Sequence, residues 1–418
     1  MADDSLPRIA ILGAGPIGLE ASLYARYLGY QVELIERGAS PAANVLQWGH
    51  VRLFTPFGMN ASPLGVAALQ AQDPSWQPPA AEDMLSGAEY LERYLKRLAE
   101  SDLVAGPLQC ETEVVAAGRK DWLKCEGVGD ADRGASPFVL LLRTSDGQER
   151  VTEADVVIDC TGTFGNHNWL GQGGIPAPGE TTASAHIDYG LPDVLGRDKQ
   201  RYQGKLTLVV GAGYSAATVI TQLAKLAEAK ITWLTRNTTE SGPIARNTPD
   251  RLASRDALAA EANRLATEDG PVSPCAGTSI TAVEYREATD DFAVVFDGED
   301  ARETIFDRIV ANVGYRADNR IYSELQVHEC YATGGPMKLA AQLLGNSSAD
   351  CLDQTSCGPQ SLLNPEPNFY ILGSKSYGRG AQFLLSVGLE QIREVFTIIG
   401  EREDLDIYAT MPVIPNDQ

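Results

Sequence analysis

The sequence predicts an α/β protein with more than one domain, and three observations support that prediction. The chain has 418 residues, which at about 150 residues per domain corresponds to two or three domains. Its apolar fraction of 44% is enough to fill hydrophobic cores, so a disordered chain is excluded. A pattern of strand, glycine-rich turn, helix and strand occurs twice, beginning at Arg8 and at Leu206.

The first copy of the pattern has every element of a dinucleotide-binding unit. The apolar run 9–12 is typical of a buried parallel strand, and a glycine-rich turn over 13–18 follows it. In such a turn Gly13 allows the tight bend, Gly15 lets the backbone approach a pyrophosphate, and Gly18 lets the helix pack on the strand. Glu36 ends the next strand, where a carboxylate that binds a ribose is expected. The dinucleotide contacts predicted from this copy are Gly13, Gly15, Pro16, Ile17, Gly18, Glu36 and Arg37.

The second copy ends in a base instead of an acid. Its first strand is 206–210, a glycine-rich turn over 211–216 follows, and its second strand, 231–234, leads to Arg236. A planar cation suits a ribose 2′-phosphate, so Arg236 favours NADP(H) over NAD(H), with a solvated surface arginine as the alternative. The contacts predicted here are Gly211, Gly213, Tyr214, Ser215 and Arg236. Two such units in one chain indicate two dinucleotides and hydride transfer from a nicotinamide to a flavin.

With three further segments, the sequence resembles the flavoproteins that have two dinucleotide-binding domains, a superfamily that includes thioredoxin reductases and flavin-containing monooxygenases. The segments are a strand over 154–162, a strand and turn over 308–318, and a strand over 368–373. They occur in the order found in that superfamily and span nearly the whole chain.

The resemblance implies a Rossmann-like FAD domain with an inserted Rossmann-like NAD(P) domain. It places the FAD domain at 1–165 and 306–418 and the NAD(P) domain at 166–305. The chain would return to the FAD domain over 305–310, and residues 113–153 would form a small antiparallel meander.

The resemblance also implies contacts to FAD beyond the first glycine turn. They are Trp48, Val114, Thr161, Gly162, Gly373 and Ser374. Family members often have an aspartate at the position of Ser374 that holds the ribityl chain of the flavin, and here Ser374 and Lys375 follow the glycine. A long helix over 381–399 would direct the positive end of its dipole at the flavin.

Catalytic residues are not identified by the sequence. His50 and Arg52 are weak candidates, because they lie in a segment that runs beside the cofactor in this fold, and ordinary buried or surface roles are the alternative for both. The histidine fingerprint of flavin-containing monooxygenases is only partly present: the run 183–189 contains His186 and the aromatic Tyr189, but it lacks the phenylalanine and the glycine of that fingerprint.

Composition limits the kinds of binding partner and the cellular compartment that are expected for this chain. The net charge of −22 argues against nucleic acid and anionic membrane surfaces as partners. No apolar run is long enough for a transmembrane helix, and the first residues do not resemble a secretory signal, so a cytoplasmic protein is expected. The seven scattered cysteines are not a disulfide framework, although Cys351 and Cys357 remain open as a redox pair. No metal site is expected from the four histidines.

Three functions are compatible with the resemblance. The favoured one is a flavin monooxygenase that oxidises a small molecule with O₂ through a flavin C4a-hydroperoxide. The first alternative is an NAD(P)H-dependent reductase or dehydrogenase that passes electrons to a small molecule or a carrier protein. The second is a non-catalytic flavoprotein that senses redox state. A homodimer is left open by analogy with the fold.

Overall fold

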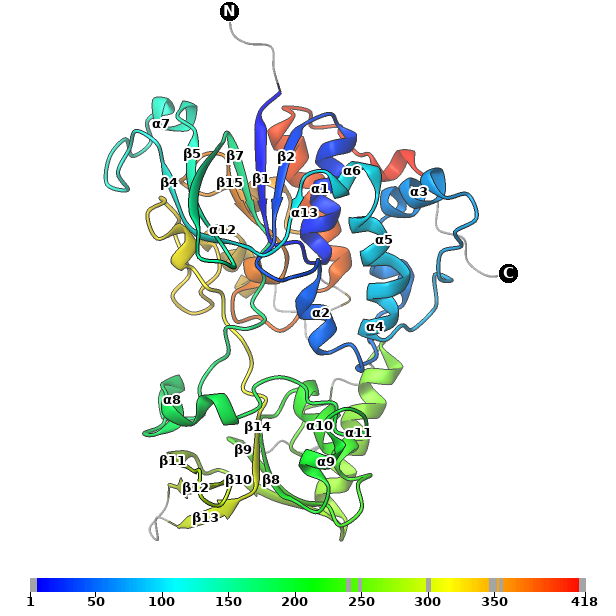
Figure 1. Cartoon of the computed structure of the whole chain (residues 1–418), viewed down its shortest axis with the longest axis vertical. Helices are drawn as coiled ribbons and strands as arrows, with labels where there is room; N and C mark the ends of the chain where they lie inside the picture. The colour runs from blue at the N-terminus through cyan, green and yellow to red at the C-terminus, as the bar shows by residue number, and fades with distance from the viewer. Residues whose placement is uncertain are drawn as a thin grey trace, which may run out of the picture. The chain divides into compact units, whose positions relative to one another are not determined.

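The computed structural model describes residues 6–237, 242–246, 250–297, 302–345, 352 and 356–412. The chain divides into two compact units, the first made of Met1–Phe164 with Arg316–Gln418 and the second of Gly165–Tyr315 (Figure 1). Each unit has its own parallel sheet, so the second unit is an insertion in the first, and the predicted α/β class is confirmed. Among the described residues no helix combines the length and the apolar character needed to cross a membrane.

The first unit is built on a five-stranded parallel sheet in the order β15-β7-β1-β2-β3. Its strands are β1 (Arg8–Leu12), β2 (Gln31–Ile35), β3 (Leu108–Gln109), β7 (Val156–Asp159) and β15 (Phe369–Ile371). The central strands are buried on both faces, as expected for short apolar runs in a parallel sheet.

Two layers cover this sheet. Ile9 and Ile11 face a core shared with helices α1 (Pro16–Tyr27) and α13 (Leu385–Ile399), which pack against each other (Figure 1). Ala10 and Leu12 point the other way, toward the antiparallel meander of β4 (Thr112–Arg119), β5 (Phe138–Thr144) and β6 (Glu149–Ala154). The predicted meander is therefore confirmed, and it closes the face that the helices leave uncovered.

Short helices fill the long connections of the first unit. Most lie between β2 and β3 and add tyrosine and leucine side chains to the helix-side core. The helices are α2 (Ala43–Gln47), α3 (Pro63–Gln72), α4 (Gly87–Tyr90), α5 (Lys96–Ala99), α6 (Asp102–Ala105), α7 (Ala131–Ala135) and α12 (Met337–Gly345), with a π-helical turn at Leu91–Leu95 and 3₁₀ turns at Phe57–Met59, Arg320–Tyr322, Pro359–Leu362, Gly373–Tyr377 and Tyr408–Thr410.

A buried charge cluster ties the meander to the segment before β15. Glu366 accepts hydrogen bonds from Arg119 Nε at 2.7 Å, from Arg133 Nη2 at 2.7 Å and from the backbone N–H of Gln326 at 2.8 Å. The side chains of this triad are at most 1% exposed. Burial raises the pKa of Glu366, but the hydrogen bonds from Arg133 and Arg119 outweigh it and leave the pKa below its ordinary value.

The second unit repeats the architecture with four parallel strands in the order β10-β9-β8-β14. Its sheet is covered on one face by helices and on the other by an antiparallel meander. The strands of the sheet are β8 (Leu206–Val210), β9 (Lys230–Thr235), β10 (Val272–Ala276) and β14 (Arg308–Ala311). The helices are α8 (Glu180–Ala183), α9 (Lys199–Tyr202), α10 (Tyr214–Leu223) and α11 (Ala253–Thr267), with 3₁₀ turns at Gln172–Gly174 and Ser184–His186. The strands of the meander are β11 (Ile280–Arg286), β12 (Asp291–Phe296) and β13 (Glu303–Phe306).

The chain leaves the second unit later than expected. The predicted return over 305–310 is wrong, because β14 pairs with β8 from Arg308↔Thr207 to Ala311↔Val210. Ile309 and Val310 are fully buried there, so this strand completes the second sheet. The return to the first unit follows Tyr315.

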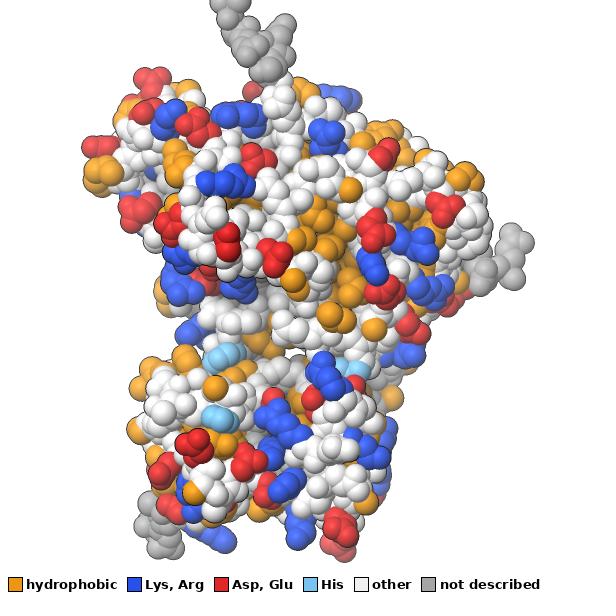
Figure 2. All heavy atoms as spheres, viewed as in Figure 1, with side chains coloured by type: hydrophobic (Ala, Val, Ile, Leu, Met, Phe, Trp, Pro, Cys, Tyr) orange, Lys and Arg blue, Asp and Glu red, His pale blue; other side chains and the backbone are white. Residues whose placement is uncertain are grey.

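The surface carries charges of both signs despite the net charge of −22. Acidic and basic side chains are interspersed on the face of each unit that Figure 2 shows. Arg8 with Asp155 and Arg143 with Glu149 are examples of exposed ion pairs, at 2.9 and 2.8 Å. Such exposed pairs contribute little to stability, and the architecture rests on the buried cores.

Candidate functional site: two glycine cradles

The first glycine turn has three glycines with three different surroundings. Gly13 has a φ of +90°, and a Cβ there would lie 2.9 Å from the carbonyl oxygen of Cys160. A Cβ at Gly18 would overlap the carbonyl oxygen of Gly13. A Cβ at Gly15, in contrast, would meet no atom within 4 Å. Gly13 and Gly18 are thus required by the packing of the chain, whereas Gly15 borders open space.

The open space at Gly15 is also the amino end of a helix. Gly15 is the N-cap residue of α1 and Pro16 follows in the first turn, and no side-chain hydrogen bond caps this end. The first N–H groups of a helix lack partners within it, and together with the helix dipole they favour an anion. A pyrophosphate that approaches the backbone of Gly15 would meet both features.

The carboxylate of Glu36 is held against this turn. Its Oε2 accepts a hydrogen bond from the N–H of Ala14 at 2.8 Å, and its Oε1 accepts one from the N–H of Gly38 at 2.6 Å. The side chain is half-buried at the end of β2, whereas the neighbouring Arg37 is exposed. Glu36 therefore lies where a ribose adjoining the pyrophosphate would be bound, and the backbone fixes its orientation.

The carboxyl ends of β7 and β15 bring four more predicted residues to the turn. A Cβ at Gly13 would lie 3.0 Å from Cα of Thr161, and one at Gly162 would lie 3.4 Å from Oγ of Ser374. A Cβ at Gly373 would lie 3.4 Å from Cγ1 of Ile17. Gly162 and Gly373 have φ of +69° and +72°, a region that favours glycine. These segments and the first glycine turn, including Ile17, form one surface at the carboxyl edge of the sheet, which we call the first cradle.

A buried ion pair lies beneath this cradle, and sequence reasoning missed it. Lys375 Nζ is 2.6 Å from Asp159 Oδ2, and both side chains are fully buried. Lys375 also donates to Thr161 Oγ1 at 3.0 Å, and Thr161 donates through its N–H and its hydroxyl to Asp159 Oδ1 at 3.0 and 2.6 Å. The hydroxyl of Thr161 is committed to this network, so a cofactor would meet the backbone of Thr161 and Gly162.

The segment that supplied the weak catalytic candidates has other partners. Arg52 is exposed, donates to the carbonyl oxygen of Met84 and lies 3.8 Å from Glu89. Trp48 packs closely on Gly87, where an added Cβ would be 2.7 Å from the indole ring. Their observed partners come from the helical connection between β2 and β3.

The other two predicted residues of the first unit are largely enclosed. His50 is half-buried, and its Nε2 has no hydrogen-bond partner in the described part of the chain. Val114 is 8% exposed and belongs to the core under the meander. For Val114 the backbone, and not the side chain, is the part that could face a cofactor.

The second glycine turn repeats the geometry of the first. Gly211 has a φ of +130°, and a Cβ there would overlap the carbonyl oxygen of Asn312. Gly213 is the N-cap residue of α10, and a Cβ there would meet no atom within 4 Å. Tyr214 and Ser215 form the first turn of this helix, with Ser215 exposed. We call this surface the second cradle.

The arginines near the second cradle differ in their partners. Arg236 follows the last residue of β9 and is exposed. Arg246 forms two hydrogen bonds with Asp256, at 2.8 and 2.7 Å, and this ion pair leaves its guanidinium less available to a phosphate. Arg236 is therefore the better placed of the two to meet a 2′-phosphate at the end of β9.

An aromatic cluster in the second unit was not foreseen. The rings of His167 and Tyr189 stack with centroids 3.5 Å apart, and Trp169 lies edge-on to His167 at 4.8 Å. Burial, and then the hydrogen bond to Glu180, raise the pKa of Tyr189. His186, the histidine of the partly present monooxygenase fingerprint, stacks on Tyr285, with ring centroids 3.6 Å apart. Nothing in the sequence pattern signals which of these rings meet.

The six described cysteines are free thiols, and five of them are in poor settings for thiolate chemistry, the exception being the exposed Cys125. Burial raises the pKa of four of them: Cys110, Cys160, Cys275 and Cys357. Hydrogen bonds from the backbone of Thr333 and Ala332 lower the pKa of Cys330, but that residue is only 4% exposed. Cys351 lies outside the described residues, and the redox pair with Cys357 stays a prediction. Within the described ranges no group of His, Cys, Asp and Glu is arranged to hold a metal ion.

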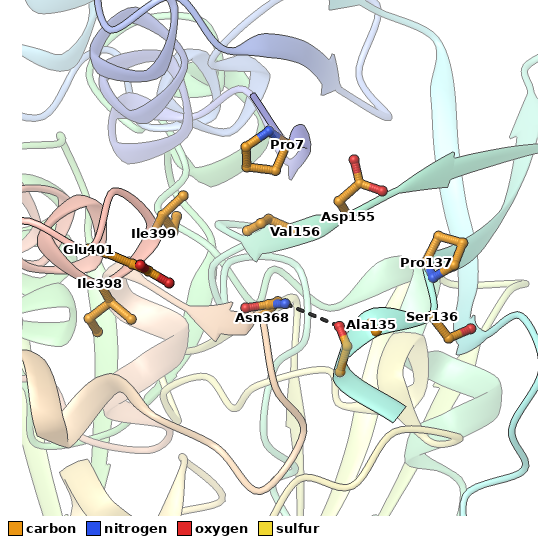
Figure 3. A pocket seen from close by; sticks show the side chains of 11 residues that line it. Pro7, Ala135, Ser136, Pro137, Asp155, Val156, Asn368, Ile398, Ile399 and Glu401 are labelled. Atoms are coloured by element: carbon orange, nitrogen blue, oxygen red, sulfur yellow. Dashed lines mark hydrogen bonds between the residues drawn. The ribbon is translucent and has the colours of Figure 1, made fainter. Parts of the chain in front are cut away.

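A cavity of about 220 Å³ lies at the opposite end of the first sheet (Figure 3). Pro7, Val156 and Asn368 line it at the amino ends of their strands, and Asn368 Nδ2 lies 3.4 Å from the carbonyl oxygen of Gly134. In open parallel sheets ligands bind at the carboxyl ends of the strands. This cavity is therefore separate from the first cradle.

Comparison with known proteins gives matches in structure alone. The sequence matches no protein-family model, and no curated protein matches it. A bacillithiol disulfide reductase from Bacillus cereus superposes with a TM-score of 0.66 at 17% identity, over 96% of this chain and 100% of that chain. A thioredoxin reductase from T. acidophilum superposes with a TM-score of 0.58 at 15% identity, over 95% and 99% of the two chains.

A third structural match was solved with its cofactor. The cadaverine monooxygenase of desferrioxamine biosynthesis from Erwinia amylovora, bound to FAD, superposes with a TM-score of 0.59 at 14% identity, over 99% of this chain and 100% of that chain. The chain therefore has the fold of the flavoproteins with two dinucleotide-binding domains. The predicted resemblance is confirmed, and at these identities it is a likeness of fold.

Proposed function

We propose that this chain is an FAD-dependent oxidoreductase that takes hydride from NAD(P)H. The observation that carries the proposal is the pair of cradles, in which Gly15 and Gly213 face open space while the glycines beside them are packed. Glycine at an open position of this kind is explained by a ligand that the backbone must approach closely. Two cradles call for two dinucleotides, one to deliver hydride and one to receive it.

The residues of the first cradle fit FAD. The N–H groups at the start of α1 would meet the pyrophosphate, and Glu36 would accept hydrogen bonds from the ribose of the adenosine half. Ser374, beside Gly162, offers a hydroxyl to the ribityl chain in place of the aspartate often found in the superfamily. FAD supplies a flavin ring that accepts two electrons from a nicotinamide and passes them to the substrate or to O₂.

The second cradle would hold the nicotinamide dinucleotide. Arg236 at the end of β9 supports NADP(H) over NAD(H), because a guanidinium pairs with a 2′-phosphate and an acid in its place would repel it.

For the electron acceptor we propose O₂, so that the protein acts as a monooxygenase on a small molecule. The cysteines support this choice, since the second unit contains only Cys275 and hence no dithiol of its own. A reductase is the second candidate, and the disulfide reductase and the thioredoxin reductase of the same fold favour it. The proposed partners are a small substrate and O₂, with a cytoplasmic location and a homodimer as parts of the same proposal.

The test uses the full-length protein loaded with FAD. Under anaerobic conditions NADPH, and more slowly NADH, is expected to bleach the flavin absorbance, and the Gly213→Ala variant should keep FAD but bleach poorly. Transfer of ¹⁸O from ¹⁸O₂ into a product would support the monooxygenase, whereas reduction of a disulfide or quinone without oxygen incorporation would support the reductase. Flavin that NADPH and NADH both fail to reduce would overturn the proposal and favour a sensor.

A further inference from the structure

The first cradle rests on a charge pair whose two side chains are fully buried. Asp159 is the last residue of β7, and Lys375 belongs to the 3₁₀ turn Gly373–Tyr377 that follows β15. The two are 216 residues apart in the chain, yet their charged atoms meet at 2.6 Å with no exposed surface on either side chain. The ring of Tyr322 encloses the ammonium group further, with its centroid 5.1 Å from Nζ.

A buried ion pair of this kind is weak support for stability. The loss of hydration on burial offsets much of the attraction between the charges, and apolar residues of similar size are often as stable or more so. The pair contributes mainly to orientation, because the hydrogen bonds of each charged group form only in certain directions. The arrangement of partners around Asp159 and Lys375 therefore indicates what the pair positions.

The hydrogen bonds of the pair lead to the two segments that form the floor of the cradle. Asp159 Oδ1 accepts both the N–H and the hydroxyl of Thr161, which sets the turn into Gly162. Lys375 holds the 3₁₀ turn that carries Ser374 and reaches across to Thr161 Oγ1 at 3.0 Å. One network of side chains thus joins the segments that carry the adjoining residues Gly162 and Ser374.

We propose that the Asp159–Lys375 pair is a positioning lock that holds Thr161-Gly162 and Gly373-Ser374 in the geometry that binds FAD. This inference rests on the proposed function, since it assigns the first cradle to FAD. Lys375 and Asp159 touch each other and Thr161, and they act on the cofactor through the two segments that they join.

The variant that tests the lock is Asp159→Asn with Lys375→Met. It removes both charges together, so neither is left buried alone, and the amide oxygen still accepts from Thr161. The apo protein is expected to unfold at the urea concentration of the wild type or higher. FAD is expected to bind at least about tenfold more weakly, because no side chain then joins the turn with Ser374 to Asp159 and Thr161, and the backbone bond from Leu372 N–H to the carbonyl oxygen of Asp159 is left as the link to β7.

The chain offers a matched control at the other end of β15. Arg133→Met removes one buried cation from the triad of Arg119, Arg133 and Glu366 and leaves one balanced pair. This variant should lower the stability of the apo protein while FAD affinity stays within about twofold of the wild type.

The outcomes separate the lock from the proposed function. If wild-type protein binds no FAD, both the function and the lock are overturned. If wild type binds FAD and the double variant binds it equally well, the lock alone is overturned. Loss of affinity in both variants, in proportion to their loss of stability, would likewise overturn it. Weaker binding in the double variant alone, without loss of apo stability, supports the lock.

Discussion

Replacement of Gly15 by alanine separates folding from cofactor binding. Gly15 has φ −73° and ψ −175°, which is extended backbone that alanine adopts readily, and the new methyl group meets no atom within 4 Å. The free energy of unfolding of the apo protein should stay the same or rise by up to about 1 kcal/mol, since alanine restricts the unfolded chain.

The same methyl group would occupy the space through which a pyrophosphate approaches the backbone. Forcing an extra methyl into a close contact typically costs about 1–3 kcal/mol, which corresponds to binding weakened about 5- to 150-fold. Titration of the apo protein with FAD, followed by quenching of flavin fluorescence or by calorimetry, measures this loss. Urea unfolding of the apo protein measures stability in parallel.

Gly18→Ala is the matched control, because the added Cβ would overlap the carbonyl oxygen of Gly13. That variant should lose stability, whereas Gly15→Ala should not. Gly213→Ala, in the second cradle, should leave FAD affinity unchanged. Wild-type FAD affinity in Gly15→Ala would refute the assignment of the first cradle, and unaltered stability of Gly18→Ala would refute the packing argument.

Three further predictions concern charge. Glu366→Gln should destabilise the protein at pH 7 by about 3–5 kcal/mol, because it leaves two buried arginines without a carboxylate. Since the folded-state pKa of Glu366 is depressed, the difference in stability between the variant and the wild type should shrink as pH falls below about 4. A difference in urea midpoints that stays constant with pH would contradict this. Burial raises the pKa of Glu20, so this carboxyl lowers wild-type stability as pH rises from about 4.3 toward its folded pKa. Glu20→Gln should therefore gain stability relative to wild type over that pH range, and parallel stability curves would speak against it. Arg236→Ser should raise KM for NADPH about tenfold or more while KM for NADH changes little, and equal changes for both would remove Arg236 from NADP(H) recognition.

The glycine turns were predictable because their requirements are local. A positive φ at Gly13, a close helix packing at Gly18 and an open backbone at Gly15 follow from the order of residues within one turn. The strand that precedes each turn is equally readable from its apolar run. Glu36 was predictable for the same local reason, because a residue directly after β2 lies beside the first glycine turn.

The pairing partner of each strand could not be predicted from local sequence. The run 308–311 is a strand in both the prediction and the structure, but its neighbour is β8 and not a strand of the first unit. An apolar run states that a strand is buried, and its pairing depends on contacts made far away in the chain. The return point of the chain therefore moved to Arg316.

By itself, then, the sequence determined the two glycine-rich turns, the α/β class and the acid or base that follows each second strand. Only the tertiary structure decided which charges are buried. A lysine after Gly373-Ser374 normally points to water, and it is buried here because Asp159, 216 residues earlier, ends the neighbouring strand. The stack of His167 on Tyr189 has the same origin. Burial and pairing are properties of segments brought together by the fold, and no local pattern carries them.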